Sequence, residues 1–229
     1  MRCLRGFLAC GFSATLVAAA PATAEVLYDD GLPNGTLQAW FIDSYGVADS
    51  FTLGSSSLVT DVTFDSWTFA GVAPAMVDWT IASLPDGTGA TYGSGTATLT
   101  PTFLFNNGVD NNGLGFDIYR NSFPVTPLNL AAGTYWLVLS NSITSNPIVE
   151  AGWDVNFGPS QGWLGSLPGG YLSNDYCAEA VGLPAVTSCG NTFQILGPAQ
   201  SSVPEPASLS LAASALGLLA LLRTRRKAA

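Results

Sequence analysis

Hydrophobic and polar residues alternate along much of this chain, and the alternation predicts β-strands. Val77, Trp79 and Ile81 are separated by polar residues, which is typical of a strand with one buried face. Residues 133–139 are hydrophobic at both parities and predict a central strand that is covered on both faces. Residues 193–196 predict a closing strand.

One strand-like segment changes the parity of its large hydrophobic residues. Val62 and Phe64 occupy one parity, whereas Trp67 and Phe69 occupy the other. A β-bulge adds one residue to a strand and shifts its parity in this way. We therefore expect a bulge or a bend near Asp65–Ser66.

Turn signals separate the strand-like segments, and no convincing amphipathic helix appears between residues 25 and 198. Residues 85–87, 106–108 and 111–113 have the Asn, Asp and Gly chemistry of turns. Residues 164–184 are rich in Gly, Pro and Ser and predict a long loop region. Many short strands without intervening helices predict an all-β fold, an antiparallel β-sandwich that is jelly-roll-like.

The N-terminal segment has the layout of an export signal. Residues 1–5 are positively charged, residues 6–20 are hydrophobic, and Ala22–Ala24 is an A-x-A cleavage site. We expect residues 1–24 to be a signal peptide and the mature chain to begin at Glu25. Residues 25–198 then form the β-sandwich ectodomain.

A linker and a sorting tail are expected over residues 199–229. The tail has a rigid kink, a hydrophobic run and a basic cluster, formed in turn by Pro204, Glu205 and Pro206, by residues 207–222, and by Arg223, Arg225, Arg226 and Lys227. As a single helix the hydrophobic run is about 24 Å long, slightly less than the ~30 Å hydrocarbon core of a bilayer. The basic cluster stands where the positive-inside rule places a cytoplasmic flank.

This tail resembles the PEP-CTERM sorting signal of bacterial surface proteins. The resemblance implies that the precursor is held in the inner membrane and that an exosortase cuts it near Pro204–Pro206. Signal peptidase would act at Ala24. The mature protein is then expected at the cell surface or in the extracellular matrix.

The body of the chain also resembles one recurring group of PEP-CTERM ectodomains. The resemblance rests on residues 78–81, 131–137, 152–154 and 193–197. It implies a sandwich fold and carries no established biochemical activity.

The ectodomain is strongly acidic. The chain has 16 acidic and 7 basic residues, and the two terminal segments account for one acid and six bases. Between Glu25 and Ser202 this leaves 15 acids and a single base, Arg120. Such a charge repels phosphate backbones and anionic lipid, so we expect no nucleic-acid partner and membrane contact only through the tail.

The cysteines and the missing histidine limit the chemistry. Cys177 and Cys189 remain after export, and an even pair in an exported domain predicts a disulfide. The chain has no histidine, which excludes Ser-His-Asp and Cys-His catalysis and ordinary zinc sites. We therefore expect that the protein is not an enzyme. The least favoured alternative is a glycosidase with a carboxylate pair, either Glu150 with Asp154 or Asp110 with Asp117.

Residues 106–113 form the densest run of oxygen-bearing side chains. A hairpin loop with Asn-Gly turns is the favoured interpretation. The alternative is a calcium site with Asp110, Asn112 and Asp117 as candidates, although the run lacks EF-hand spacing. Asp29–Asp30 is another acidic pair. We therefore expect no cofactor, with calcium as the alternative.

Trp163 lies in loop-like sequence and is the best candidate for an exposed aromatic platform. The first functional hypothesis is a non-enzymatic surface or matrix protein with a structural role in extracellular polysaccharide. The second is a carbohydrate-binding adhesin module, with or without assistance from calcium, in which Trp163 contacts the sugar.

Overall fold

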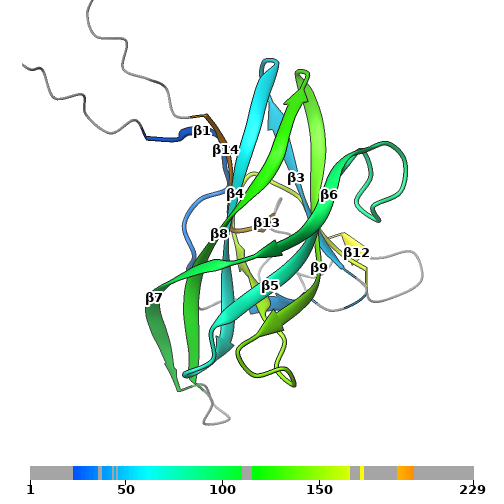
Figure 1. Ribbon diagram of the computed structural model, residues 1–229. Helices are drawn as coiled ribbons and strands as arrows, with labels where there is room; N and C mark the ends of the chain where they lie inside the picture. Colours follow the sequence, from blue (N-terminus) through cyan, green and yellow to red (C-terminus); the bar gives the residue numbers. More distant parts are fainter. Residues whose placement is uncertain are drawn as a thin grey trace, which may run out of the picture. The chain divides into compact units, whose positions relative to one another are not determined.

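The described part of the chain consists of β-strands in two antiparallel sheets (Figure 1). The computed structural model describes residues 23–35, 38–42, 44, 46–109, 115–165, 171–172 and 190–198. No helix occurs in these ranges, and so none that is long and apolar enough to cross a membrane is found there. The all-β prediction is confirmed, while the expected signal peptide and C-terminal helix lie outside the described residues.

The larger sheet has eight strands within the described ranges. They are β1 (Glu25–Asp29), β2 (Gln38–Phe41), β4 (Ser57–Phe69), β7 (Thr100–Val109), β8 (Gly115–Leu130), β10 (Gly152–Asn156), β13 (Gly190–Asn191) and β14 (Phe193–Gly197). The long strand β4 organises this sheet, because β8 pairs with one edge of it over most of its length. On its other edge β14 pairs first and β10 follows, which places β2 and β13 beside β10.

The smaller sheet has six described strands in the order β12-β11-β3-β9-β5-β6. Their bounds are β3 (Val47–Leu53), β5 (Pro74–Ala82), β6 (Thr91–Thr98), β9 (Gly133–Thr144), β11 (Gly162–Leu164) and β12 (Tyr171–Leu172). Strand β9 lies between β3 and β5, as the sequence predicts for a central strand. Its core face is closed by Tyr135, Leu137 and Leu139, but Trp136 and Val138 on the other face are only half-buried.

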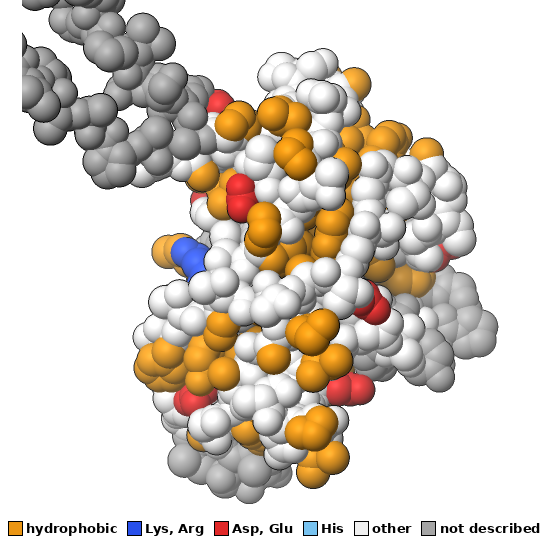
Figure 2. All heavy atoms as spheres, viewed as in Figure 1, with side chains coloured by type: hydrophobic (Ala, Val, Ile, Leu, Met, Phe, Trp, Pro, Cys, Tyr) orange, Lys and Arg blue, Asp and Glu red, His pale blue; other side chains and the backbone are white. Residues whose placement is uncertain are grey.

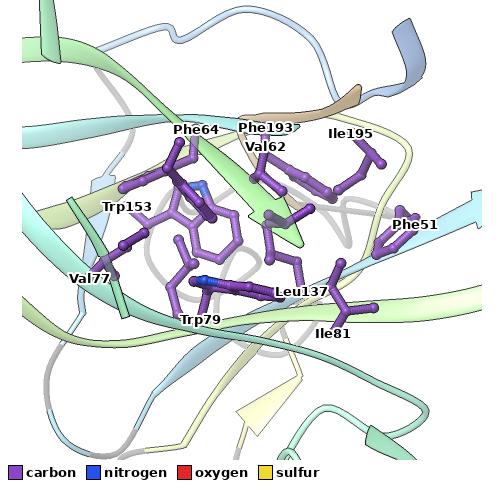
Figure 3. Close-up of a cluster of buried hydrophobic side chains, with 14 of the residues drawn as sticks. Phe51, Val62, Phe64, Val77, Trp79, Ile81, Leu137, Trp153, Phe193 and Ile195 are labelled. Atoms are coloured by element: carbon purple, nitrogen blue, oxygen red, sulfur yellow. The ribbon is translucent and has the colours of Figure 1, made fainter. Parts of the chain in front are cut away.

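The two sheets pack face to face around a single hydrophobic core. Figure 3 shows Phe64, Trp153 and Phe193 of the larger sheet meeting Trp79 and Leu137 of the smaller one. Trp153 is fully buried, and its ring lies edge-on to Phe64 and Phe193 with centroids 6.0 and 5.7 Å away. Burial of large aromatic rings in such contacts stabilises a sandwich strongly.

The prediction of a bulge or bend near Asp65–Ser66 is wrong. Strand β4 pairs continuously with β8 through this point, and its only register shift along β8 lies between Val59 and Asp61. Trp67 and Phe69 have the other parity because their side chains lie on the outer face of the sheet. The change of parity therefore marks a change of face, which follows from the alternation of side chains along a strand.

Parts of two predicted irregular segments lie in strands instead. Residues 106–108 belong to β7, which pairs Asn106 with Asp117 before its register shifts. Gly108 has a φ of 83° there, so the turn chemistry is used inside the strand pair. Leu164 belongs to β11, which pairs with β3, so the start of the expected loop region extends the smaller sheet. The turn at residues 85–87 is confirmed by the hydrogen bond from Gly87 N to Leu84 O.

Candidate functional site

A trough opens on the outer face of the larger sheet where Gly152 replaces a side chain. Gly152 of β10 pairs with Phe41 of β2 on one side and with Trp67 of β4 on the other. Residues paired directly across strands point to the same face, so the two aromatic rings flank a position without a side chain. A Cβ at Gly152 would lie 2.8 Å from the Cβ of Ala39. The glycine is therefore required by the close approach of β2.

Four aromatic rings form the walls of this trough, which has a volume of about 260 Å³. We call it the aromatic trough; it is lined by Phe41, Trp67, Phe69, Phe116, Ala39, Gly152, Gln38 and Glu150. Phe116 packs against Trp67 at 5.6 Å and stacks on Phe69 at 5.3 Å between ring centroids. Phe41 is 58% exposed and Phe69 38% exposed. The trough thus presents an apolar surface with one carboxylate, that of Glu150.

A buried carboxylate fixes the ring of Trp67. The indole Nε1 of Trp67 donates a hydrogen bond to Asp154, which is fully buried. The same carboxylate accepts hydrogen bonds from the backbone N–H groups of Asn34 and Gly35, each 3.3 Å away. Burial raises the pKa of Asp154 to about 7, against the effect of these donors. The wall of the trough is therefore preorganised by a residue that does not touch its interior.

The segment that holds Asp154 is itself tied to the sheet. Asn34 Nδ2 donates to Val155 O at 3.0 Å, and Asn107 Nδ2 donates to Gly35 O at 3.2 Å. Gly35 has a φ of 62°, and a Cβ there would overlap the ring of Phe105. Figure 2 shows hydrophobic side chains gathered over β7, the strand to which the exposed Phe105 belongs.

Trp163, the predicted platform, lies in a strand. It pairs with Ala48 of β3 and Leu172 of β12, and its side chain is half-buried. The residue is thus fixed in the smaller sheet, whereas the convergent aromatic rings lie on the larger one. Trp163 stays a prediction as a ligand contact.

The predicted calcium candidate Asp117 is occupied by hydrogen bonds. Its carboxylate accepts from Asn106 Nδ2 at 2.7 Å and from Gly71 N at 2.8 Å. Asp110 and Asn112 lie outside the described residues. Asp117 of β8 therefore links β7 and the turn after β4 through hydrogen bonds.

The nominated carboxylate pair Glu150 and Asp154 does not share an open site. Glu150 is exposed and lines the aromatic trough, whereas Asp154 is buried beneath Trp67. Ala24 is exposed and precedes β1 directly. The remaining predicted residues lie outside the described ranges: Cys177, Cys189, Pro204, Glu205, Pro206, Arg223, Arg225 and Arg226. Their expected disulfide and processing roles stay predictions.

Sequence reasoning missed the aromatic trough, although one signal for it was present. Trp67 and Phe69 have the parity opposite to the core residues of their own strand, which places large aromatic rings on an outer face. Two outward aromatic rings on one strand indicate a surface with a use beyond packing. Phe41 and Gly152 carry no such signal, because their pairing with Trp67 depends on strand order.

Comparison with known proteins identifies the tail. Residues 202–227 match the PEP-CTERM protein-sorting motif. No curated protein and no solved structure matches the chain. A sorting tail attached to a β-sandwich defines the class of exported proteins that are processed at a membrane. More particularly, the chain carries the PEP-CTERM motif, which implies a membrane-anchored precursor sorted by an exosortase.

Proposed function

We propose that this protein is a non-enzymatic component of the cell surface or extracellular matrix that binds polysaccharide through the aromatic trough. The observation that carries the proposal is the group of convergent rings around Gly152, two of which are exposed. The sorting motif supports it, because the motif implies an exported protein. Signal peptidase at Ala24 and an exosortase would process the precursor.

The chemistry of the trough suits a sugar. A pyranose ring has an apolar face of C–H groups and a rim of hydroxyl groups. The faces of Phe41 and Trp67 can stack on the former, while Glu150 can hydrogen-bond to the latter. The fixed ring of Trp67 would bind with little loss of side-chain entropy.

The charge of the ectodomain favours a neutral polysaccharide. Arg120 is the only base between residues 25 and 202, and it does not line the trough. A polymer of uronic acids would be repelled by the 15 acids of this segment. Hydrolysis by two carboxylates needs a second acid about 5–9.5 Å from the first. Glu150 is the single acid among the described residues that line the trough, which supports binding without cleavage.

Affinity electrophoresis of matched variants tests the proposal. The full chain is run in gels that contain either a neutral glucan or a uronic-acid polymer. Phe41→Ala should weaken retardation by the neutral glucan about tenfold, which corresponds to roughly 1.4 kcal/mol of lost stacking. Phe103→Ala is the control, because Phe103 is 54% exposed on the same sheet and does not line the trough.

Three results would contradict the proposal that polysaccharide binds in the aromatic trough. Equal losses in Phe41→Ala and Phe103→Ala would indicate a general effect of surface hydrophobicity. A loss in Trp163→Ala with full binding in Phe41→Ala would move the site to the strand β11. Retardation by the uronic-acid polymer alone would contradict the expectation that the acidic ectodomain prefers a neutral polysaccharide. Melting temperatures of all variants serve as a check on folding.

A further inference from the structure

Two carboxylates lie buried between the sheets, at a site separate in its lining from the aromatic trough. Asp30 follows β1 of the larger sheet and is 1% exposed, and Asp49 in β3 of the smaller sheet is 0% exposed. Ser160 precedes β11 and Asn191 ends β13, and both side chains are buried. We call these four residues the oxygen cluster. It brings together segments from both sheets.

Each member of the oxygen cluster has an oxygen atom without a hydrogen-bond partner among the described residues. The atoms are Asp30 Oδ2, Asp49 Oδ1, Ser160 Oγ and Asn191 Oδ1. The other carboxylate oxygens are satisfied: Asp30 Oδ1 accepts from Tyr28 and from Ser160 N, and Asp49 Oδ2 accepts from Asn191 N. Buried acceptors without donors are rare and destabilising, so a group that satisfies them is expected.

Three of these side chains converge on one point. A Cβ built on Gly190 would overlap Ser160 Oγ and lie 2.7 Å from Asp30 Oδ2 and 3.1 Å from Asp49 Oδ2. Ser160 Oγ lies close enough to lower the pKa of both carboxyl groups, yet it makes no hydrogen bond with regular geometry in the described part of the chain. The absence of a side chain at Gly190 leaves space beside the unpartnered Ser160 Oγ and Asp30 Oδ2, and the Asp49 carboxylate reaches the same space with Oδ2, which accepts from Asn191 N.

The described residues supply no positive charge for this site. Arg120 is the only base between residues 25 and 202, and it is paired with Asp65 at 2.9 Å. Burial raises the pKa of Asp30 to about 6 and that of Asp49 well above its usual value, and the charge of Asp30 raises the pKa of Asp49 further. A water molecule could donate to the acceptors, but it supplies no positive charge, whereas a cation would favour the ionised form of both carboxyl groups.

We propose that the oxygen cluster is a calcium site, with carboxylate oxygens of Asp30 and Asp49 and the hydroxyl of Ser160 as ligands. A divalent cation both neutralises two carboxylates and satisfies acceptors that lack donors. Calcium accepts about six to eight oxygen ligands in flexible geometry and tolerates hydroxyl, amide and water oxygens. Magnesium demands a stricter octahedron that three side chains on separate loops and strands fit less well. The site has two acids rather than three, and no group of three His, Cys, Asp or Glu residues occurs in the described ranges.

Asp30 connects the site to solvent. It lines a cleft of about 540 Å³ together with Asp29, Gly31, Asn156 and Gly158. Water molecules from this cleft can complete the coordination shell, and the ion can enter by the same path. Because Asp30 and Asp49 belong to different sheets, a bound ion would tie the end of β1 to β3 and β13. Calcium would then stabilise the sandwich once the protein is outside the cell, where calcium sites of millimolar affinity are filled.

Calorimetry and thermal unfolding of the full chain in detergent test this site. After a chelator has removed divalent cations, titration with CaCl₂ should show one ion per chain. The melting temperature should rise by about 5–10 °C at a calcium concentration of ~100 times the Kd. Asp49→Asn should abolish both signals. In chelator the variant should melt at the same temperature as the parent or higher, because it removes an uncompensated buried charge.

Further variants keep the test decisive. Asp154→Asn is the matched control, since Asp154 is also 0% exposed, and it should keep the calcium response. Ser160→Ala leaves both carboxylates in place and should weaken calcium binding about tenfold, even if Asp49→Asn does not fold. The proposal is overturned if the parent chain shows no calcium heat and no shift. It is also overturned if the response survives Ser160→Ala and Asp49→Asn but disappears in Asp117→Asn, which would place the ion in the Asn-rich run.

Discussion

Arg120 and Asp65 face each other directly across β8 and β4 and form a two-point ion pair. Nε and Nη2 of Arg120 lie 2.9 Å from Oδ1 and Oδ2 of Asp65 respectively. Asp65 is 1% exposed, and burial raises its pKa even though Arg120 opposes this by hydrogen bonding and charge. The only base of an acidic ectodomain is thus used to compensate one buried carboxylate.

Removal of Arg120 should destabilise the sandwich more than removal of the whole pair. Arg120→Gln leaves Asp65 buried and uncompensated, and we expect a loss of about 3 kcal/mol in the free energy of unfolding. The arginine side chain is 31% exposed, which places the effect at the low end for buried pairs. In the double variant Arg120→Gln/Asp65→Asn most of this loss should be recovered. Urea denaturation measures both, and equal losses would show that the charge of Asp65 is not the cause.

The strands of the sandwich could be predicted from local pattern, but their neighbours could not. Val77, Trp79 and Ile81 alternate as a half-buried strand should, and all three are buried in β5. The alternation is set by residues two positions apart, so one sequence contains it. The pairing of Gly152 with both Phe41 and Trp67 depends on strands more than 80 residues apart, and no local pattern encodes it.

The oxygen cluster carried a sequence signal that is clear only in retrospect. Asp49 shares its parity with Val47 and Phe51, both buried, so an acid stands at a core position of β3. An acid on the core face of a strand is rarely there for packing. The sequence marks its partner Asp30 only as part of the acidic pair Asp29–Asp30. That the two acids meet depends on the packing of the sheets, which the sequence pattern does not specify.

Gly190 should be intolerant of even one added carbon atom. Its Cβ would overlap Ser160 Oγ and crowd Asp30 Oδ2, both of which belong to buried side chains. We expect Gly190→Ala to lower the free energy of unfolding by about 1–3 kcal/mol through overpacking. Gly54→Ala is the control, since nothing lies within 4 Å of a Cβ at Gly54. A Gly190→Ala protein as stable as Gly54→Ala would mean that the cluster can move apart freely.

Processing at both ends should be visible in the intact mass of the protein from its native host. We expect the mature chain to lack residues 1–24 and everything beyond Pro204–Pro206, because the sorting motif covers residues 202–227. Membrane-bound and released pools are measured separately. An added mass at the new C-terminus would identify a covalent anchor. A tail that persists in every pool would contradict exosortase processing and leave a protein anchored by its own hydrophobic segment.

The stability of the sandwich should fall as the pH rises through the titration of Asp154. The pKa of Asp154 is about 7 in the folded protein, against an ordinary value of 3.8 for an aspartate, because the carboxyl group is buried. The folded state therefore binds more protons than the unfolded state between pH 4 and 7 or so, and stability decreases with pH there. The stabilisation present below pH ~4 is lost by pH ~8, and it amounts to something on the order of 4 kcal/mol.

Asp154→Asn isolates this contribution, because an amide does not titrate. The difference in unfolding free energy between the parent chain and the variant should shift in favour of the variant as the pH rises from 4 to 8. Asp30 and Asp49 titrate in both proteins, so their contributions cancel in the difference. Asp86→Asn is a control of opposite sign, since hydrogen bonds from Thr88 lower the pKa of the exposed Asp86. A difference for Asp154→Asn that stays flat from pH 4 to 8 would mean that Trp67 and the backbone donors of Asn34 and Gly35 compensate the burial of this carboxylate fully.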